Sequence, residues 1–323
     1  HISIITLSEN KEICSLLKAI DEIYYLDLKN PFSFFFKYFK LLQEIKKKNY
    51  DFIVDLEFVT NFSALTTLLI SIVSKPCATI GFSSPSKWRN KIYSIAIPFD
   101  HSRHITEIFA KVFFPLVEKS FSVDFEIPKR DMISSAKLSP LVEKLLEKHS
   151  EANKIVCVNI NAGKICYLRR WPQENYVELI LGLYHRFGIK VVLVGGEGDV
   201  GYVNDFIMKL PKKNNIFNFC GKLSIKELVG LFTKSRLLIT NDSGPLHIAS
   251  IVDLPTVSFF GPETPYLYGP LGPEHHVFYE DIFCSPCINI YNAKASSCNN
   301  NICLKSIGSE IVMKTIEEKN FLT

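Results

Sequence analysis

The sequence has no long apolar run, no strong excess of charge and no low-complexity segment. Its longest nearly uncharged apolar stretch, residues 61–74, contains several hydroxyls and is shorter than the roughly 20 residues that a membrane-spanning helix needs. We find no signal peptide. A net charge of +4 is too mild for a dedicated nucleic-acid-binding protein. These absences predict a folded cytoplasmic protein that neither spans a membrane nor binds nucleic acid.

The composition is that of an ordinary globular protein, with 47% hydrophobic and 22% charged residues, which excludes a disordered or fibrous chain. At 323 residues the chain is long enough for two domains, each with its own core. Five of the nine cysteines are scattered along the sequence, as expected for reduced core residues of a cytosolic protein. The other four lie close together near the end of the chain.

Short β-rich segments alternate with helical segments in both halves of the chain. The predicted strands are residues 2–7, 22–28, 51–57, 78–82, 154–160, 190–196, 215–221, 236–242 and 255–261. The predicted helices include residues 33–48, 61–74, 173–187, 200–209, 224–234 and 245–252. Such alternation is typical of βαβ units and parallel sheets. It predicts an α/β fold of two doubly wound, Rossmann-like domains that face a central cleft.

The segment between the two alternating regions has no such pattern, and we place the domain boundary within it. The predicted domains are residues 1–140 and 141–323. We expect the last helix to pack back on the first domain. A ligand would then lie in the cleft, at the carboxyl ends of the strands.

The stretch "LLITNDSGPLHIAS" runs from a predicted buried strand into a predicted helix. Asp242 or Ser243 is suited to cap that helix, and Gly244 lets the backbone approach a ligand closely. A well-capped helix does not explain His247, which lies one helical turn beyond Ser243. Because the first N–H groups of a helix lack partners and carry the positive end of its dipole, we favour a phosphate or other anion site here.

The stretch "NAGKICYLRRWP" supplies cations after the first strand of the second half: Lys164, Arg169 and Arg170. The carboxyl ends of parallel strands meet at one edge of a sheet, so these cations and the turn before His247 can face the same cleft. Arginine offers two parallel donors to phosphate oxygens. The alternative for each cation is a solvated surface charge. For Lys164 this alternative and phosphate binding are equally favoured.

The stretch "VVLVGGEGDVG" places Gly196, Gly198 and Gly201 in a G-x-G-x-x-G pattern after a strand, which is compatible with a dinucleotide site. Such a site also requires an acidic residue at the end of the next strand, and "NIFNFCG" has none. We therefore favour an ordinary strand-to-helix turn, from which Glu197 can face a nucleotide ribose.

Several of these stretches together resemble a known family. They are "NAGKICYLRRWPQENYVELILGL", "VVLVGGEGD", "CGKLSIKELVGLFTKSRLLITNDSGPLHIASIVDLPTVSFFGP" and "YDFIVDLEFVTNFSALTTLL". They are similar to glycosyltransferase family 9, the heptosyltransferases of lipopolysaccharide assembly, over nearly the whole chain. The resemblance implies a GT-B fold, a nucleotide-sugar donor in the C-terminal half, an acceptor in the N-terminal half, and inverting transfer without a metal or other cofactor.

The resemblance and the residue patterns together give a set of donor-binding candidates. These are Asp242, Ser243, Gly244, His247, Arg169, Lys164 and Glu197. The resemblance puts the Asp-Ser-Gly turn at the donor diphosphate and sugar. Arg169 stands where the family commonly has a lysine that contacts phosphate, so the charge is kept, and Glu197 is the candidate for the ribose.

Inverting transfer is a displacement at the anomeric carbon, in which the acceptor hydroxyl loses a proton as the diphosphate leaves. The resemblance implies a catalytic base on the loop after a first strand. Because the sequence begins at His1 in what resembles the family's second strand, we expect that base upstream of His1 and assign no catalytic residue. Asp55 and Glu57, at the end of a predicted strand, are acceptor-side candidates.

Four cysteines form a C-x2-C-x10-C-x4-C pattern near the end of the chain: Cys284, Cys287, Cys298 and Cys303. This spacing suits a structural zinc ion or an iron–sulfur cluster. Unligated thiols and a redox-labile pair are the alternatives. The resemblance implies no required metal, and we predict none.

Residues 31–48 interleave aromatic side chains with lysines, which suits either a helix on a membrane surface or a core helix with a solvated basic end. The leading hypothesis is an enzyme that transfers heptose from ADP-heptose to a lipid-linked oligosaccharide, the lipopolysaccharide core or a related glycan, at the cytoplasmic face of the inner membrane. The alternatives are a GT-B transferase with another nucleotide sugar, an NAD-dependent oxidoreductase and a non-catalytic sugar-nucleotide-binding remnant.

Overall fold

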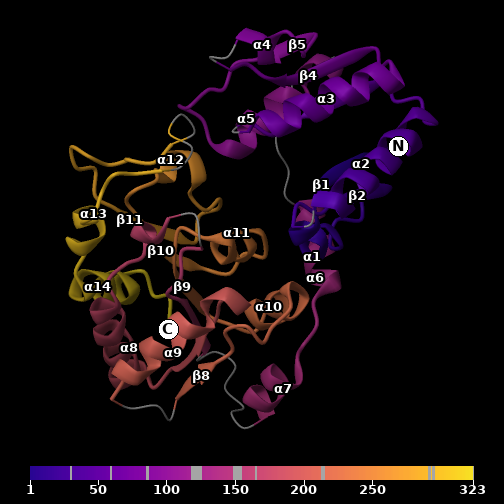
Figure 1. Cartoon of the computed structure of the whole chain (residues 1–323). Helices are drawn as coiled ribbons and strands as arrows, with labels where there is room; N and C mark the ends of the chain where they lie inside the picture. Colours follow the sequence, from indigo (N-terminus) through magenta and orange to yellow (C-terminus); the bar gives the residue numbers. More distant parts are fainter. Residues whose placement is uncertain are drawn as a thin grey trace. The chain divides into compact units, whose positions relative to one another are not determined.

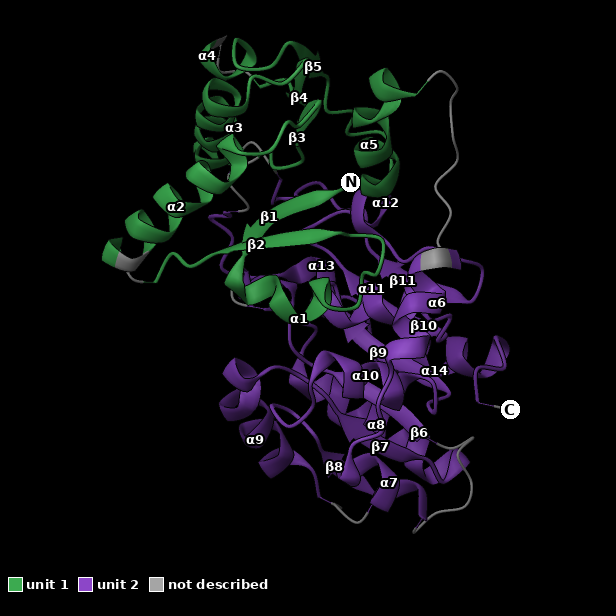
Figure 2. Ribbon diagram, turned by 90° about the vertical axis from the view of Figure 1, so that its right-hand side faces the viewer, with its two compact units in different colours: residues 1–124 green, residues 125–323 purple. Residues whose placement is uncertain are grey.

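The chain forms two compact units, His1–Asp124 and Phe125–Thr323, in a computed structural model (Figures 1 and 2). The structure describes residues 1–29, 31–58, 60–84, 87–117, 126–147, 155–163, 166–211, 215–289, 292 and 295–322. Helix α6 (Glu126–Ser135) packs on α10 (Ile225–Phe232), and the Lys137 N–H donates to the Lys226 carbonyl at 3.0 Å. These contacts join α6 to the second unit, so the units divide before the predicted boundary at residue 140.

The first unit contains short parallel strands and the helices between them. Its strands are β1 (Ser3–Leu7), β2 (Glu22–Leu26), β3 (Phe52–Asp55), β4 (Ala78–Phe82) and β5 (Ile95–Ile97). Its helices are α1 (Lys11–Cys14), α2 (Pro31–Lys46), α3 (Asn61–Ser74), α4 (Lys87–Asn90) and α5 (Ile105–Val112). Over the described residues, β1 pairs with β2 in one sheet and β3, β4 and β5 form another. The predicted strands are present, but β5 has only three residues and escaped prediction.

Helices α2 and α3 pack against each other, as their amphipathic sequences allow. Leu41 and Ile45 of α2 are buried in one small core with Leu26 of β2 and Ile70 of α3. The observed α3 has the predicted bounds, and it ends at Lys75, whose φ of 48° cannot continue a right-handed helix.

The second unit contains one six-stranded parallel sheet in the order β11-β10-β9-β6-β7-β8. Its strands are β6 (Ile155–Asn159), β7 (Lys190–Leu193), β8 (Ile216–Asn218), β9 (Leu237–Asn241), β10 (Thr256–Phe260) and β11 (His275–Tyr279). The chain first runs outward from β6 to β7 and β8, then returns to the other side of β6 for β9, β10 and β11. Five of these strands were predicted, and β11 was not.

The central strands of this sheet are buried on both faces, which explains why they are apolar almost throughout. Alternate residues, such as Val156 and Ile239, join a core formed with helices on one side. The residues between them, such as Cys157 and Leu238, are equally buried. Strand ends at the carboxyl edge are therefore held rigidly.

The helices of the second unit follow the predicted alternation. They are α6, α7 (Pro140–Glu147), α8 (Gln173–Phe187), α9 (Val200–Lys209), α10, α11 (Gly244–Ile251), α12 (Pro265–Tyr268), α13 (Ile302–Lys305) and α14 (Ser309–Glu318). The bounds of α8 and α9 are those predicted. Helix α14, the last, packs on α8 within its own unit, and its Val312, Met313 and Ile316 belong to the sheet core. None of the helices formed by the described residues has both the length and the apolarity that a membrane crossing needs.

Candidate functional site

The carboxyl ends of β6 and β9 lie side by side at the point where the strand order reverses. The chain leaves β6 toward β7 and leaves β9 toward β10, so the two outgoing loops diverge and leave space between them. Open α/β sheets bind ligands at such a point. In this protein these two connections contain the predicted stretches, residues 161–172 and 241–247.

A cavity of about 390 Å³ opens at this point. Its lining combines both predicted loops with residues from after β10: Ala162, Gly163, Arg169, Asp242, Ser243, Gly244, His247, Glu263, Tyr268 and Ile288. The structure thus brings together Arg169 and the predicted Asp-Ser-Gly turn with His247. Lys164 lies outside the described residues.

The start of α11 forms one wall of the cavity. Ser243, at the position before the helix, has an extended backbone with φ −165° and ψ 167°, and within the described residues its side chain does not cap the helix. Its hydroxyl lies instead 2.8 Å from Asn159 Nδ2 and 3.1 Å from the Asn241 carbonyl. The interpretation of this turn as a simple helix cap therefore fails for Ser243, and the backbone at Gly244 borders open space that an anion can occupy.

Arg169 is a cationic side chain in the lining of the cavity. Its Nη1 donates to Asp242 Oδ2 at 3.0 Å and its Nη2 to the Ala162 carbonyl at 2.6 Å, while the side chain is only 16% exposed. Among the described residues its Nε is buried and has no hydrogen-bond partner. The guanidinium of Arg169 and the backbone N–H groups at the start of α11 place fixed hydrogen-bond donors on this wall, which suits a phosphate group.

Three buried asparagines hold the two loops together, and we did not predict any of them as site residues. Asn159 Nδ2 donates to the Thr240 hydroxyl at 3.0 Å as well as to Ser243. Asn241 accepts from the Trp171 N–H at 2.8 Å and donates to the Asn161 carbonyl at 3.1 Å. The sequence did contain a signal for these residues: asparagines at the ends of otherwise apolar strands, whose buried amides need hydrogen-bond partners.

The cavity also has carboxylates. Asp242 is 5% exposed and Glu263, which follows β10, is 3% exposed. Carboxylates accept hydrogen bonds from hydroxyl groups, which is the chemistry that a sugar offers. Glu263, Tyr268 and Ile288 escaped prediction because they are far from the other lining residues in sequence.

Glu197 and the glycine pattern lie along the same edge of the sheet, after β7. Glu197 is exposed and does not line the cavity. Gly196 has an ordinary extended backbone with φ −80°, and a Cβ added at Gly201 would meet no described atom within 4 Å. A Cβ at Gly195, outside the pattern, would lie 2.4 Å from Asn161 Nδ2. The geometry thus favours the strand-to-helix turn over a dinucleotide fingerprint.

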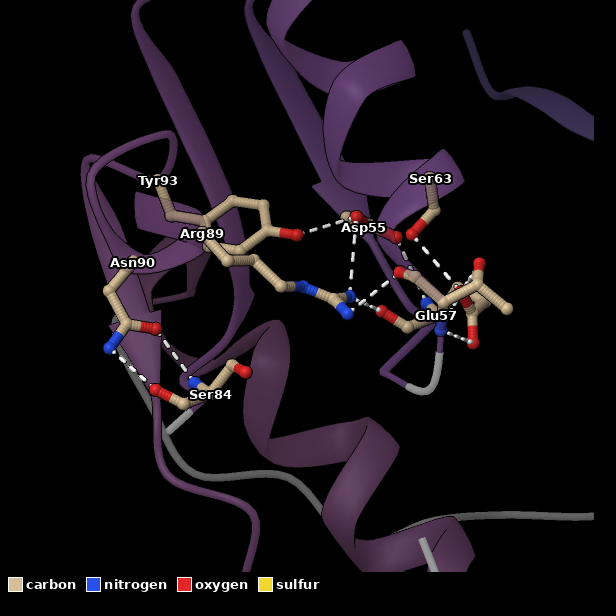
Figure 3. Close-up of polar contacts among 8 residues, drawn as sticks. Asp55, Glu57, Ser63, Ser84, Arg89, Asn90 and Tyr93 are labelled. Atoms are coloured by element: carbon tan, nitrogen blue, oxygen red, sulfur yellow. Dashed lines mark hydrogen bonds and ion pairs between the residues drawn. The ribbon is translucent and has the colours of Figure 1, made fainter. Parts of the chain in front are cut away.

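Asp55 and Glu57 lie at the end of β3 in the first unit, in a cluster of polar contacts (Figure 3). Asp55 accepts from the Tyr93 hydroxyl at 2.6 Å and lies 3.9 Å from Nη2 of Arg89. Burial raises the pKa of Asp55, although the Tyr93 hydrogen bond and the Arg89 charge act in the opposite direction. Arg89 is 2% exposed and donates to the backbone carbonyls of Glu57 and Thr60. The cluster therefore fixes the loop that follows β3.

The Glu57 carboxylate is oriented toward the start of α3. It accepts from the Thr60 N–H at 2.9 Å and from the Ser63 hydroxyl at 3.3 Å. A carboxylate at this place stabilises the helix dipole. Both acceptor-side candidates thus contribute to the architecture of this loop.

The four clustered cysteines lie in the segment that follows β11, the last of them, Cys303, in α13. Burial raises the pKa of Cys303 to about 11, with smaller contributions from the nearby thiols of Cys287, Cys284 and Cys298. The Ser296 hydroxyl donates to Cys287 Sγ at 3.3 Å. Among the described residues, no three side chains of His, Cys, Asp or Glu have the arrangement that a metal ion requires.

Comparison with known proteins connects this geometry to a family. Residues 38–296, most of the chain, match glycosyltransferase family 9 (heptosyltransferase). The chain belongs to this family. The resemblance inferred from the sequence is thereby confirmed.

Relatives and solved structures of family 9 agree with this assignment. Lipooligosaccharide heptosyltransferase 2 of Campylobacter jejuni subsp. jejuni serotype O:6 is 25% identical over 223 residues, which are 68% of this chain and 67% of that protein. Lipopolysaccharide heptosyltransferase 2 of Salmonella typhimurium is 32% identical over 111 residues, 34% of this chain and 32% of that protein.

The fold of this family 9 member is that of solved heptosyltransferases. A family 9 glycosyltransferase from Veillonella parvula superposes with a TM-score of 0.71 at 21% identity, over 99% of this chain and 88% of that one. Escherichia coli ADP-heptose lipopolysaccharide heptosyltransferase II superposes with a TM-score of 0.68 at 18% identity, over 98% of this chain and 88% of that one. The predicted α/β fold of the GT-B type, with parallel sheets, is confirmed.

Proposed function

We propose that this protein transfers a heptose from ADP-heptose to the lipopolysaccharide core or a related glycan. The observation that carries the proposal is the ion pair of Arg169 with Asp242, beside the start of α11, in the lining of one cavity at the reversal of strand order. Family membership supports a sugar transferase. One solved relative is described as Escherichia coli heptosyltransferase WaaC with ADP, which favours the same nucleotide here.

In this proposal the cavity binds the donor diphosphate and sugar. Arg169 and the backbone N–H of Gly244 contact the phosphates, and His247 supports them from the next turn. Asp242 accepts hydrogen bonds from sugar hydroxyls, because a carboxylate repels phosphate but binds hydroxyl groups. Lys164 and Glu197 complete the donor site, the latter at the ribose.

The proposed reaction is an inverting displacement without a metal ion. As the anomeric carbon–oxygen bond breaks, negative charge grows on the leaving diphosphate. Fixed donors that face this charge lower the barrier without rearranging during the reaction. Arg169 is such a donor, because two hydrogen bonds already hold its guanidinium in place.

We assign the acceptor to the first unit, His1–Asp124, and the donor to the second unit, Phe125–Thr323. The loop after β3, which the Asp55 and Arg89 cluster fixes, belongs to the acceptor side, with Asp55 and Glu57 as its polar groups. A lipid-linked oligosaccharide acceptor would bring the enzyme into peripheral contact with the cytoplasmic face of the inner membrane.

Calorimetric titration of ADP-heptose, ADP, UDP, GDP and NAD tests the donor site. We expect ADP to bind, and Arg169→Ala and Asp242→Asn to weaken ADP-heptose by about 10- to 100-fold, the loss of a charged hydrogen bond. Arg186→Ala and Asp205→Asn are matched controls, since both side chains are exposed on the surface of the same unit and outside the cavity.

The alternative functions give different results in this titration. Binding of UDP or GDP in place of ADP would indicate a GT-B transferase with another donor. Binding of NAD that neither variant affects would place the site at the glycine turn and contradict the proposal. ADP binding without release of ADP from ADP-heptose in the presence of acceptor would indicate a non-catalytic binding protein.

A further inference from the structure

The outer side of α2 presents an unusual set of exposed aromatic side chains. Phe32, Phe35, Phe36 and Phe39 are 89%, 70%, 76% and 62% exposed. At about 3.6 residues per turn these positions fall within an arc of about 100°. The opposite side of α2 is buried in the small core described above. The four phenylalanines therefore form one continuous stripe that the described part of the chain leaves exposed.

Helix α3, which packs beside α2, also has exposed apolar side chains. They include Leu65, Leu69 and Ile72, which are 48%, 41% and 61% exposed. The helices are adjacent, since the Tyr38 hydroxyl donates to the Thr66 hydroxyl at 3.0 Å, and Figure 1 shows them lying alongside each other. We call the exposed apolar side chains of α2 and α3 together the aromatic face.

Positive charge is concentrated beside this face. Residues 31–48 contain five lysines and one glutamate, a net charge of +4, which equals the net charge of all 323 residues. The rest of the chain is therefore neutral in sum. Lys48 pairs with Glu22. Of the other lysines, Lys46 is exposed at the end of α2 in line with the phenylalanine stripe, and Lys47 is exposed just beyond the helix. Helix α3 has no charged residue.

We propose that the aromatic face docks on an anionic lipid bilayer. Soluble surfaces rarely leave large contiguous apolar patches in water. A helix with phenylalanine on its outer side and lysine beside it can lie in the bilayer interface, with its apolar side chains among the acyl chains and its lysines at the headgroups. A second copy of the chain is a poorer occupant, because a twofold contact would bring the lysines of both copies together.

The proposal rests on the proposed function only in that a lipid-linked acceptor gives the docking a purpose. The surface itself lies within one unit and involves none of the donor-site residues. Lipid docking and donor binding can therefore be measured separately on the same preparation.

Co-sedimentation of the full chain with vesicles tests the proposal. We expect strong binding to vesicles of phosphatidylglycerol and phosphatidylcholine, and weak binding to phosphatidylcholine alone. Phe35→Ser with Phe36→Ser should reduce the partition coefficient at least about tenfold, through loss of buried apolar area. Lys46→Gln with Lys47→Gln should reduce it by about 25-fold, or about fivefold for each lysine.

Matched controls distinguish vesicle binding through the aromatic face from non-specific vesicle binding. Phe283→Ser removes an aromatic side chain that is 96% exposed in the other unit. Lys314→Gln with Lys319→Gln removes the same charge from exposed positions of the second unit. Both should leave vesicle binding unchanged. Circular dichroism and ADP titration of each variant confirm that it is folded.

Three results would overturn the proposal: no preference for anionic vesicles, equal losses in the face and control variants, or a dimer in light scattering that the phenylalanine variants dissociate. ADP binding without vesicle binding contradicts the docking alone. Vesicle binding without ADP binding contradicts the proposed donor site alone.

Discussion

Arg169 Nη1 lies 3.0 Å from Asp242 Oδ2, and this ion pair joins the loop after β6 to the turn after β9. The two residues are 73 positions apart in the sequence. Because the same guanidinium also donates to the Ala162 carbonyl, its orientation is fixed before any ligand arrives. This relationship makes the geometry of the donor site sensitive to the shape of residue 169 as well as to its charge.

Arg169→Lys should weaken ADP binding about 3- to 10-fold relative to the unmodified protein, which is less than the loss expected for Arg169→Ala. The ammonium keeps the charge but cannot hold both present partners in the planar geometry of a guanidinium. Calorimetry of the two variants in parallel measures the difference. Equal affinity of Arg169→Ala and the unmodified protein would remove this residue from the donor site.

Gly244→Ala should leave stability unchanged or slightly higher and weaken ADP binding at least about tenfold. A Cβ at this position meets no described atom within 4 Å, so the fold has room for it, but the methyl group would occupy space at the start of α11 that we assign to phosphate. Thermal unfolding and ADP titration report the two effects separately. Undiminished ADP affinity would show that the phosphate lies elsewhere.

Ser243→Ala should lower the free energy of unfolding by about 1–2 kcal/mol and change ADP affinity little. The Ser243 hydroxyl already has internal partners in Asn159 and the Asn241 carbonyl, so its loss leaves the Asn159 amide short of an acceptor. Denaturant unfolding and calorimetry measure these quantities. A large loss of ADP affinity at unchanged stability would mean that the hydroxyl turns toward the ligand.

Gly195→Ala and Gly201→Ala should differ sharply in stability. The added Cβ at Gly195 would lie 2.4 Å from Asn161 Nδ2 and 2.8 Å from Cys220 Sγ, whereas Gly201 lies in α9 with room for it. We expect a loss of about 1–3 kcal/mol for the first and a gain of about 0.5–1 kcal/mol for the second. If the glycine pattern were a dinucleotide fingerprint, Gly201→Ala would instead be the damaging change, and it would abolish binding of the dinucleotide.

Alkylation of the native protein should reach Cys77 and Cys284, which are exposed, before the buried thiols. Burial raises the pKa of Cys157 to about 12 and that of Cys220 to about 11, so at pH 8 both remain protonated and unreactive. Their labelling should increase only as the pH rises toward those values. Peptide mass spectrometry provides the measurement. If Cys284 resists labelling until a chelator is added, a bound metal ion would explain it and our prediction of none would be wrong.

Local sequence patterns accounted for the secondary structure because they act over a few residues. Helix α8 has its predicted bounds and ends at Phe187, before Gly188, whose φ of 62° glycine adopts readily. Apolar strands with polar ends predicted the parallel sheet and the edge at which Arg169 meets Asp242. The strand β11 escaped prediction because two of its five residues are histidines and this edge strand is only half-buried, so it lacks the apolar pattern of the central strands.

The sequence by itself determined the family, the alternation of strands and helices, and the turn at residues 241–247, since each depends on neighbours along the chain. Only the tertiary structure decided that Asn159 holds Ser243, 84 positions away, and that Glu263 enters the cavity. It also decided that Asp55 is buried against Arg89 and that the phenylalanines of α2 face solvent. The reason is physical: contacts between distant segments depend on strand order and on which helix face is covered, and neither is encoded in local periodicity.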